Sequence, residues 1–372
     1  MKKRIFTSLM VVLFIALAFL IMSVTPNGKQ SIKQDVVEPE EIVEEPTERR
    51  ASIVMVGDVL IHDSLYKDAY VSNNVYDFSK MFTYVEPIIQ QYDIAYYNQE
   101  SIIGGKKLGV STYPRFNSPD EIGEALINIG FNLVSLANNH TLDKNEAGVV
   151  YSVSFWRNQE AVYTAGSYDS WDDRNTVTIF EKNDITFAFL SYTMRTNGLN
   201  PPKGKEYLVN VYSDEQVARD IEKAKESAEV IIVAMHWGDE YKHTPNAEQK
   251  EIATYLSGLG VNLIIGAHPH VVQPIGYVND TLVIYSLGNF IAAQRTIGID
   301  KMIGLLVGVD IVVDNDSNVT FENLSYKLTY TYNDNFKDYK VIPFENLNEQ
   351  LLKNYKALEA EYLEKVEKEV VY

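Results

Sequence analysis

The chain has 372 residues, enough for one large domain or two smaller ones, and its hydrophobic fraction of 46% suits a protein with a buried core. A formal net charge of −18 argues against nucleic-acid binding, which needs a basic face. There is no cysteine, which excludes thiolate catalysis and cysteine metal sites. Any metal ligand must therefore be a histidine, a carboxylate or an amide.

Residues 1–24 have the pattern of a membrane anchor. Lys2, Lys3 and Arg4 precede an uncharged stretch, 5–24, that is long enough to span a bilayer. A cleavable signal peptide is the alternative, but "LIMSVTPNG" offers only a poor cleavage site, so we favour an uncleaved anchor. Because basic flanks stay in the cytoplasm, we expect a single-pass protein of the cell membrane whose remaining chain is extracytoplasmic.

Residues 25–50 are predicted to form an acidic, disordered tether. The stretch "DVVEPEEIVEEPTE" contains seven acidic residues, two prolines and no basic residue. This composition is typical of an extended, solvated spacer.

From residue 51 to residue 330, runs rich in β-branched and aromatic residues alternate with helical patterns. The predicted helices at 118–130 and 244–260 each begin with Ser or Thr followed by Pro and end at Gly. Predicted strands lie at 52–58, 94–100, 132–140, 229–238, 261–270 and 281–290. Two antiparallel pairs are expected as well, a hairpin turning at Asn183-Asp184 and the segments 303–313 and 319–328. The pattern predicts an α/β domain with a mixed sheet system.

Residues 331–372 are predicted to be a C-terminal extension with an amphipathic helix. We expect its apolar face to pack against the domain, with partner binding as the alternative. The apolar residues at helical spacing are Leu347, Leu351, Tyr355, Leu358, Tyr362 and Val366.

Polar residues that can bind metal follow the predicted strands, where ligands bind in open α/β sheets. Each alone can be explained as a turn or core residue, but five of the six histidines lie at or just beyond strand ends. Imidazole, carboxylate and amide groups together favour a borderline divalent metal, and a turn at Pro269 can direct His268 and His270 to one centre. The strand-end residues are Asp58, Asn98, Glu100, Asn138, Asn139, His140, His236, His268, His270 and Asn289.

Five motifs, "GDVLIH", "NQES", "LANNHTLD", "HWGDEY" and "GAHPHVVQPI", occur in this order, with "YPRFNSP" and "YSLGNF" in support. Through them the chain resembles the CapA-type poly-γ-glutamate capsule biosynthesis family over roughly residues 52–295. The resemblance implies the calcineurin-like metallophosphoesterase architecture, an αββα sandwich. It also implies a divalent metal centre, with His140 as the catalytic proton donor or acceptor. The implied metal ligands are Asp58, Glu100, Asn139, His236, His268 and His270.

Two positions depart from the metallophosphoesterase pattern. The usual first motif is Asp-x-His, whereas Asp58 is followed by Val59 and Leu60 and the next histidine is His62. Glu100 replaces the bridging aspartate of the second motif. One metal ion, or two with His62 as an added ligand, therefore fits the sequence, and the ion can be Mn, Zn, Fe or Mg. His62 fits a turn residue equally well.

Asn98, Arg115 and Arg295 are predicted to bind substrate. The two arginines lie in loops beside the motifs, where a guanidinium can bind a carboxylate through two parallel hydrogen bonds. A solvated surface charge is the alternative for both. His243 is expected to be a surface residue.

Three functions are compatible with these features. The first is a membrane-anchored, metal-dependent enzyme acting on an amide, ester or stereocentre of an anionic, glutamate-containing polymer. The second is a non-catalytic component that holds this polymer within a complex of capsule synthesis membrane proteins. The third is an envelope phosphodiesterase. The changes in the first two motifs argue against this function. His140 favours an enzyme, since a carrier needs no proton donor.

Overall fold

The computed structural model describes residues 48–294 and 298–371. The predicted anchor, residues 25–47 of the predicted tether and Arg295 lie outside the described residues. Within the described ranges, no helix has the length and apolar character needed to cross a bilayer.

The first large sheet is mixed and is built around β1, which pairs in parallel with β4 and β13 and antiparallel with β14. Seven strands follow the order β16-β15-β14-β1-β4-β5-β6, and β13 pairs with β1 off this path. The strands are β1 (Arg49–Leu60), β4 (Ile94–Asn98), β5 (Leu133–Ser135), β6 (Tyr163–Ala165), β13 (Asn289–Ala292), β14 (Ile303–Val313), β15 (Val319–Asp334) and β16 (Lys337–Pro343).

The second sheet has the order β11-β12-β10-β9-β8-β7, with four parallel central strands and an antiparallel strand at each edge. Its strands are β7 (Thr178–Lys182), β8 (Ile185–Thr193), β9 (Val230–His236), β10 (Leu263–Ala267), β11 (Ile275–Val278) and β12 (Thr281–Ile284). A short separate ribbon pairs β2 (Tyr70–Ser72) with β3 (Val75–Tyr76).

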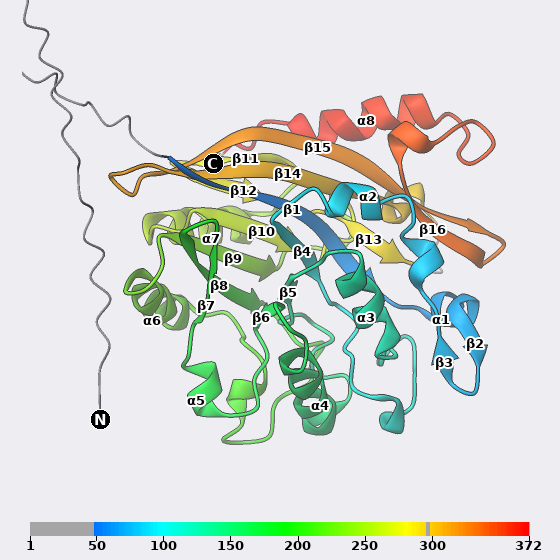
Figure 1. The fold of residues 1–372 in the computed structure, drawn as a ribbon, viewed down its shortest axis with the longest axis horizontal. Helices are drawn as coiled ribbons and strands as arrows, with labels where there is room; N and C mark the ends of the chain where they lie inside the picture. Colours follow the sequence, from blue (N-terminus) through cyan, green and yellow to red (C-terminus); the bar gives the residue numbers. More distant parts are fainter. Residues whose placement is uncertain (1–47, 295–297, 372) are drawn as a thin grey trace, which may run out of the picture. The chain divides into compact units, whose positions relative to one another are not determined.

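The two large sheets pack face to face around a buried apolar core (Figure 1). Met55 and Tyr96 of the first sheet lie in the same cluster as Ile232 and Ile265 of the second. Alternate residues of these strands point to opposite faces. Each central strand therefore buries one row of side chains between the sheets and a second row beneath helices.

Helices cover both outer faces. The first sheet is covered by α2 (Glu86–Ile89), α3 (Glu121–Asn128) and α4 (Asn145–Arg157), and the second by α6 (Asp214–Lys225) and α7 (Ala247–Gly258). A capping box formed by Asn246 and Gln249 fixes the start of α7. The prediction of a mixed α/β fold is confirmed, and its layers run helix, sheet, sheet, helix. Two further helices are α1 (Asp63–Ala69) and α5 (Trp171–Arg174).

Both expected antiparallel pairs are present. Asn183 and Asp184 turn between β7 and β8 in left-handed backbone conformations, with φ of 51° and 61°. β14 pairs with β15, but β15 continues to Asp334, so the boundary predicted at residue 330 falls within a strand. β16, which lies in the predicted extension, joins the same sheet because it pairs with β15 and buries Tyr339, Val341 and Ile342.

The C-terminal helix α8 (Tyr355–Glu367) is shorter than its apolar pattern indicates. Leu347 and Leu351 precede it, because the Asn348 side chain accepts hydrogen bonds from the backbone of residues 350 and 351 and forms a local turn. Tyr362 and Val366 are buried in the core cluster between the sheets. Figure 1 shows α8 running along β15.

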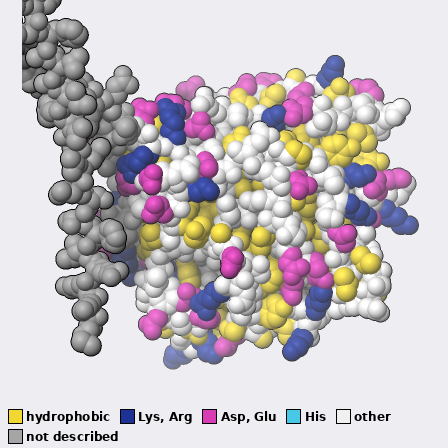
Figure 2. All heavy atoms as spheres, in the orientation of Figure 1, with side chains coloured by type: hydrophobic (Ala, Val, Ile, Leu, Met, Phe, Trp, Pro, Cys, Tyr) yellow, Lys and Arg dark blue, Asp and Glu magenta, His cyan; other side chains and the backbone are white. Residues whose placement is uncertain are grey.

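Charged side chains of both signs are mixed over the face drawn in Figure 2, with no broad region of a single sign. Some lie in surface pairs, such as Arg50 with Glu322. A mixed surface of this kind creates no long-range field that would attract a polyanion to this face.

Candidate metal centre

Strand register brings three polar side chains together at the end of β1. Asp58 is aligned with Asn98 of β4 on one side and with Asn289 of β13 on the other. The close approach of β1 to β13 requires glycine at residue 57, since a Cβ there would lie 1.8 Å from the carbonyl oxygen of Gly288. Asn98 Nδ2 donates a hydrogen bond of 2.8 Å to Asp58 Oδ1.

The second sheet supplies three histidines at the same edge. His236 ends β9 and is aligned with Ala267 at the end of β10, directly before His268. Around Pro269, His268 and His270 have φ of 97° and 59°. Such values are uncommon for residues other than glycine and cluster at functional sites, where the surrounding structure holds them.

The turn directs the two histidines to adjacent positions. His268 Nδ1 lies 3.1 Å from His236 Nε2, while His270 Nδ1 lies 3.2 Å from Asp58 Oδ2. The ring centroids of His268 and His270 are 6.0 Å apart. The pair therefore contributes to three neighbouring groups of potential metal ligands, one of which is Glu240, His268 and His270.

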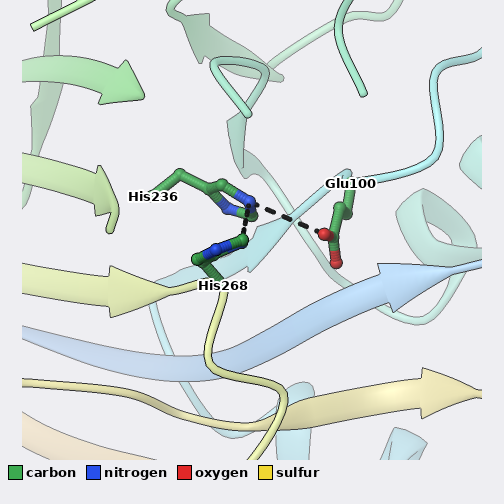
Figure 3. Close-up of side chains that lie close together, drawn as sticks. All are labelled: Glu100, His236 and His268. Atoms are coloured by element: carbon green, nitrogen blue, oxygen red, sulfur yellow. Dashed lines mark hydrogen bonds and ion pairs between the residues drawn. The ribbon is translucent and has the colours of Figure 1, made fainter. Parts of the chain in front are cut away.

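Glu100 belongs to the other two groups. One group is Glu100, His236 and His268, which Figure 3 shows converging, and the other is Asp58, Glu100 and His270. Within each group the ligand atoms lie within 4.8 Å of one another. Glu100 Oε1 lies 3.6 Å from His236 Nε2, and Oε2 lies 3.6 Å from His270 Nδ1. Each carboxylate oxygen thus faces a different group, as a bridging ligand would.

The chemistry of this cluster fits a divalent cation. Both oxygens of Glu100 are buried and lack a hydrogen-bond partner among the described residues, and so does Asn98 Oδ1. A buried carboxylate in this state is costly unless a cation compensates it. Burial raises the pKa of Glu100 well above its ordinary value. A divalent ion would bind these oxygens and compensate for their missing hydrogen bonds.

The histidines differ in their protonation. Burial and nearby histidines lower the pKa of His236 well below its usual value and that of His268 to about 3, so both rings are in the neutral form that binds metal. Burial opposes a positive charge on His270. The neighbouring carboxylates of Glu100 and Asp58 outweigh this effect and raise the pKa of His270 to about 9.

One of the two predicted asparagines, Asn98, has surroundings different from those expected. Asn139 lies beside the first group, with its Oδ1 3.0 Å from His236 Nε2. Asn98, predicted to bind substrate, does not line the pocket described below and is fully buried. As the last residue of β4, it contacts Asp58 and lies 3.3 Å from His236 Nδ1, so it holds the cluster together.

A pocket of about 910 Å³ opens beside the cluster. Leu60, His62, Thr112, Tyr113, Pro114, Arg115, Phe116, Asn139, His140, Asp143, Asn197, Leu199, Glu240, Tyr241, His270 and Gln294 line it. Arg115 is therefore at the position expected of a substrate-binding residue. Arg295 lies outside the described residues.

His140 forms a pair with Asp143 in the pocket wall. Its Nδ1 lies 2.7 Å from Asp143 Oδ2, which also accepts a hydrogen bond from the backbone N–H of Phe116. The Phe116 ring packs edge-on against His140. With Nδ1 engaged, Nε2 is the nitrogen available to a molecule in the pocket. Our sequence reading missed Asp143, although its spacing of three residues from His140 within "LANNHTLD" is a usable signal.

The remaining histidines lie outside these donor groups. His62 lines the pocket, but its Nδ1 contacts the carbonyl of Leu60, and none of the donor groups found among the described residues includes it. His243 was expected on the surface and is instead half-buried. Its ring binds the carbonyl of Val272 and Asp300 and packs against Tyr362, because α8 covers it.

Residues 52–294 match the family model described as "Bacterial capsule synthesis protein PGA_cap". The chain belongs to this capsule synthesis family. Its relatives include the PGA biosynthesis protein CapA of Bacillus subtilis strain 168, 28% identical over 246 residues, which are 65% of this chain and 63% of that protein. The capsule biosynthesis protein CapA of Bacillus anthracis is 24% identical over 253 residues, 66% of this chain and 60% of that protein. The match thus spans less than two thirds of either relative.

Solved structures resemble this member of the PGA_cap family only distantly. A hypothetical protein from Thermus thermophilus has a TM-score of 0.46 and 16% sequence identity. The superposition covers 74% of this chain and 98% of the Thermus chain. The Thermus sulfate thiohydrolase SoxB has a TM-score of 0.42, 12% identity and coverages of 84% and 61%. Purple acid phosphatase PPD1 from yellow lupin has a TM-score of 0.37, 10% identity and coverages of 76% and 54%. No activity is transferred from likenesses this distant.

Proposed function

We propose that this protein is a membrane-anchored, extracytoplasmic, metal-dependent enzyme that acts on a glutamate-containing polymer during capsule synthesis. Family membership supports the role in capsule synthesis. The observation that carries the enzymatic part is the position of the His140–Asp143 pair, in a pocket beside a buried cluster whose shared carboxylate has no hydrogen-bond partner among the described residues. A proton-transfer pair next to a cation site is typical of hydrolytic centres.

The residues that would hold the metal are Asp58, Glu100, His236, His268 and His270, with the amide of Asn139 beside them. Imidazole and carboxylate donors suit one or two ions of Mn, Zn, Fe or Mg. A bound ion would supply Lewis acidity to a carbonyl oxygen or lower the pKa of a water molecule. Glu100 is the residue on which both donor groups depend.

The pocket residues would carry out the proton chemistry. His140 would transfer the proton through Nε2, while Asp143 fixes the ring orientation and stabilises the imidazolium that forms. Phe116 restricts the movement of the ring from its edge. Arg115, on the pocket wall, would bind a carboxylate of the polymer.

The proposed location rests on the first 24 residues, whose basic start and long apolar stretch favour an anchor with the domain outside the cell. Anchoring would keep the domain near membrane proteins that make and export the polymer. A non-catalytic role in such an export complex, or an envelope phosphodiesterase, is the alternative.

Replacing His140 by Ala tests the enzymatic proposal. Metal content and fold should be retained, because His140 belongs to neither donor group around Glu100. Turnover of the polymer should fall about 10²–10⁴-fold, the usual contribution of general acid–base catalysis. Asp143→Asn should also lower turnover, since it removes the carboxylate that orients the His140 ring. Glu251→Gln, on the exposed side of α7, is the control and should match the wild type.

Surface polymer in a deletion strain provides the cellular readout. Complementation with His140→Ala should leave the cells with little polymer. Normal polymer together with normal metal content would contradict an enzyme and favour the export component, because no proton moves when a carrier binds its cargo.

A further inference from the structure

Two charged side chains on the pocket wall lack an ion-pair partner. Arg115 and Glu240 are both exposed, and within residues 48–294 and 298–371 no side chain of opposite charge pairs with either. Asp143, the other acidic residue that lines the pocket, is engaged by His140. Among the described residues, the pocket therefore presents the positive charge of Arg115 and the negative charge of Glu240 to a bound molecule.

The loop that carries Glu240 is held firmly beside the metal cluster. The backbone N–H of Tyr241 donates to the carbonyl of Pro269, and its ring stacks on His270 with centroids 6.0 Å apart. The ammonium group of Lys301 lies over the same Tyr241 ring, 4.1 Å from its centre. The Glu240 carboxylate is consequently within 4.8 Å of ligand atoms of His268 and His270, and the three residues form a third group of potential metal ligands.

Glu240 differs from Glu100 in its surroundings. Glu100 is buried, and neither of its oxygens has a hydrogen-bond partner among the described residues. Glu240 is exposed to the pocket and has the neutral hydroxyl of Tyr241 as its neighbour. Solvent compensates an exposed carboxylate, so Glu240 does not require a metal. It is placed to meet the part of a substrate that lies against the cluster.

A γ-linked polyglutamate chain offers few groups that suit this position. Every interior residue carries an α-carboxylate, which would face the like charge of Glu240 at short range. The free α-ammonium group of the amino-terminal residue is the only cation in the polymer. An ammonium group and a carboxylate form a strong, charge-assisted hydrogen bond.

We propose that Glu240 binds the free ammonium group of the polymer's amino-terminal residue, so that the protein acts at a chain end and not within the chain. Arg115 then binds an α-carboxylate farther along the pocket wall. This inference rests on the proposed function, because it takes the polymer as the molecule in the pocket. It assigns Glu240 to substrate recognition and not to metal binding.

Binding of two matched probes to the full-length protein in detergent tests the proposal. The probes are a γ-linked glutamate pentamer with a free amine and the same pentamer acetylated at its amine, titrated calorimetrically in the presence of Mn²⁺. Acetylation should weaken binding to the wild type by about tenfold to a hundredfold, the range of a hydrogen bond to a charged group. Glu240→Gln should remove this preference while keeping its metal content. Glu251→Gln, an exposed change outside the pocket, should keep the preference.

Each other outcome has a defined meaning. Equal affinity of the wild type for both pentamers would overturn end recognition and leave the proposed function intact. Loss of metal content in Glu240→Gln would overturn the assignment by making Glu240 a ligand. Failure of both pentamers to bind the metal-loaded wild type would overturn the proposed function together with the inference.

Discussion

At the residue scale, Glu100 is the side chain on which the metal-centre account rests. Its two oxygens each face a different donor group, and neither has a hydrogen-bond partner among the described residues. In the absence of metal this arrangement opposes folding, since burial raises the pKa of Glu100 and the carboxyl group must take up a proton when the chain folds. A bound cation would compensate the carboxylate and remove this cost.

Glu100→Gln should therefore have opposite effects with and without metal. In excess chelator at neutral pH, the variant should be more stable than the wild type by about 1–3 kcal/mol, because an amide is neutral in both states whereas the buried carboxyl group must take up a proton on folding. Added Mn²⁺ or Zn²⁺ should raise the melting temperature of the wild type and not that of the variant. Thermal unfolding of both proteins in detergent measures this, with Glu251→Gln as the control. A variant less stable than the wild type in chelator would show that Glu100 is satisfied without metal.

At the element scale, local pattern predicted the strands and most of the candidate site. Asp58, His236 and His268 were placed at strand ends because β-branched runs stop where polar residues begin, and the structure brings them together there. The hairpin at Asn183-Asp184 was predictable because Asn and Asp tolerate the left-handed backbone conformation that a tight turn needs.

Other features depend on which strands and loops lie beside one another in the fold, and the local sequence pattern does not specify this. Asn98 supports Asp58 only because β4 and β1 pair in that register. Glu240 reaches the cluster because its loop is tied to Pro269, far along the chain, through a backbone hydrogen bond. β16 was missed because its pairing with β15 decides its conformation.

At the scale of the whole molecule, the metal cluster lies where the carboxyl ends of strands from both sheets meet. The two groups that share Glu100 each draw on both sheets, because Asp58 lies in β1 and Glu100 follows β4, while His236 ends β9 and His268 and His270 follow β10. Assembly of the centre therefore requires the whole sandwich, and the site should be lost whenever the sheets separate.

The proposed anchor gives a prediction at the same scale. A protease added to intact protoplasts should remove the domain beyond Arg50, because the basic residues before the apolar stretch keep only the extreme N-terminus inside. Immunoblotting for the domain, with a cytoplasmic protein as the control for intact cells, measures this. Full protection of the domain would contradict the extracytoplasmic location.

Metal stoichiometry is the most direct test of the central claim, that these residues form a metal centre. The full-length protein, loaded separately with Mn²⁺, Zn²⁺, Fe²⁺ or Mg²⁺ and then dialysed, is assayed by elemental analysis. The account predicts one or two ions per wild-type chain for at least one of these metals. Replacing His268 and His270 together by Ala should reduce this to background, since imidazoles dominate affinity for borderline divalent ions, while His140→Ala should retain it. A wild-type protein that retains none of the four metals, or a double variant that keeps its full metal content, would contradict the account.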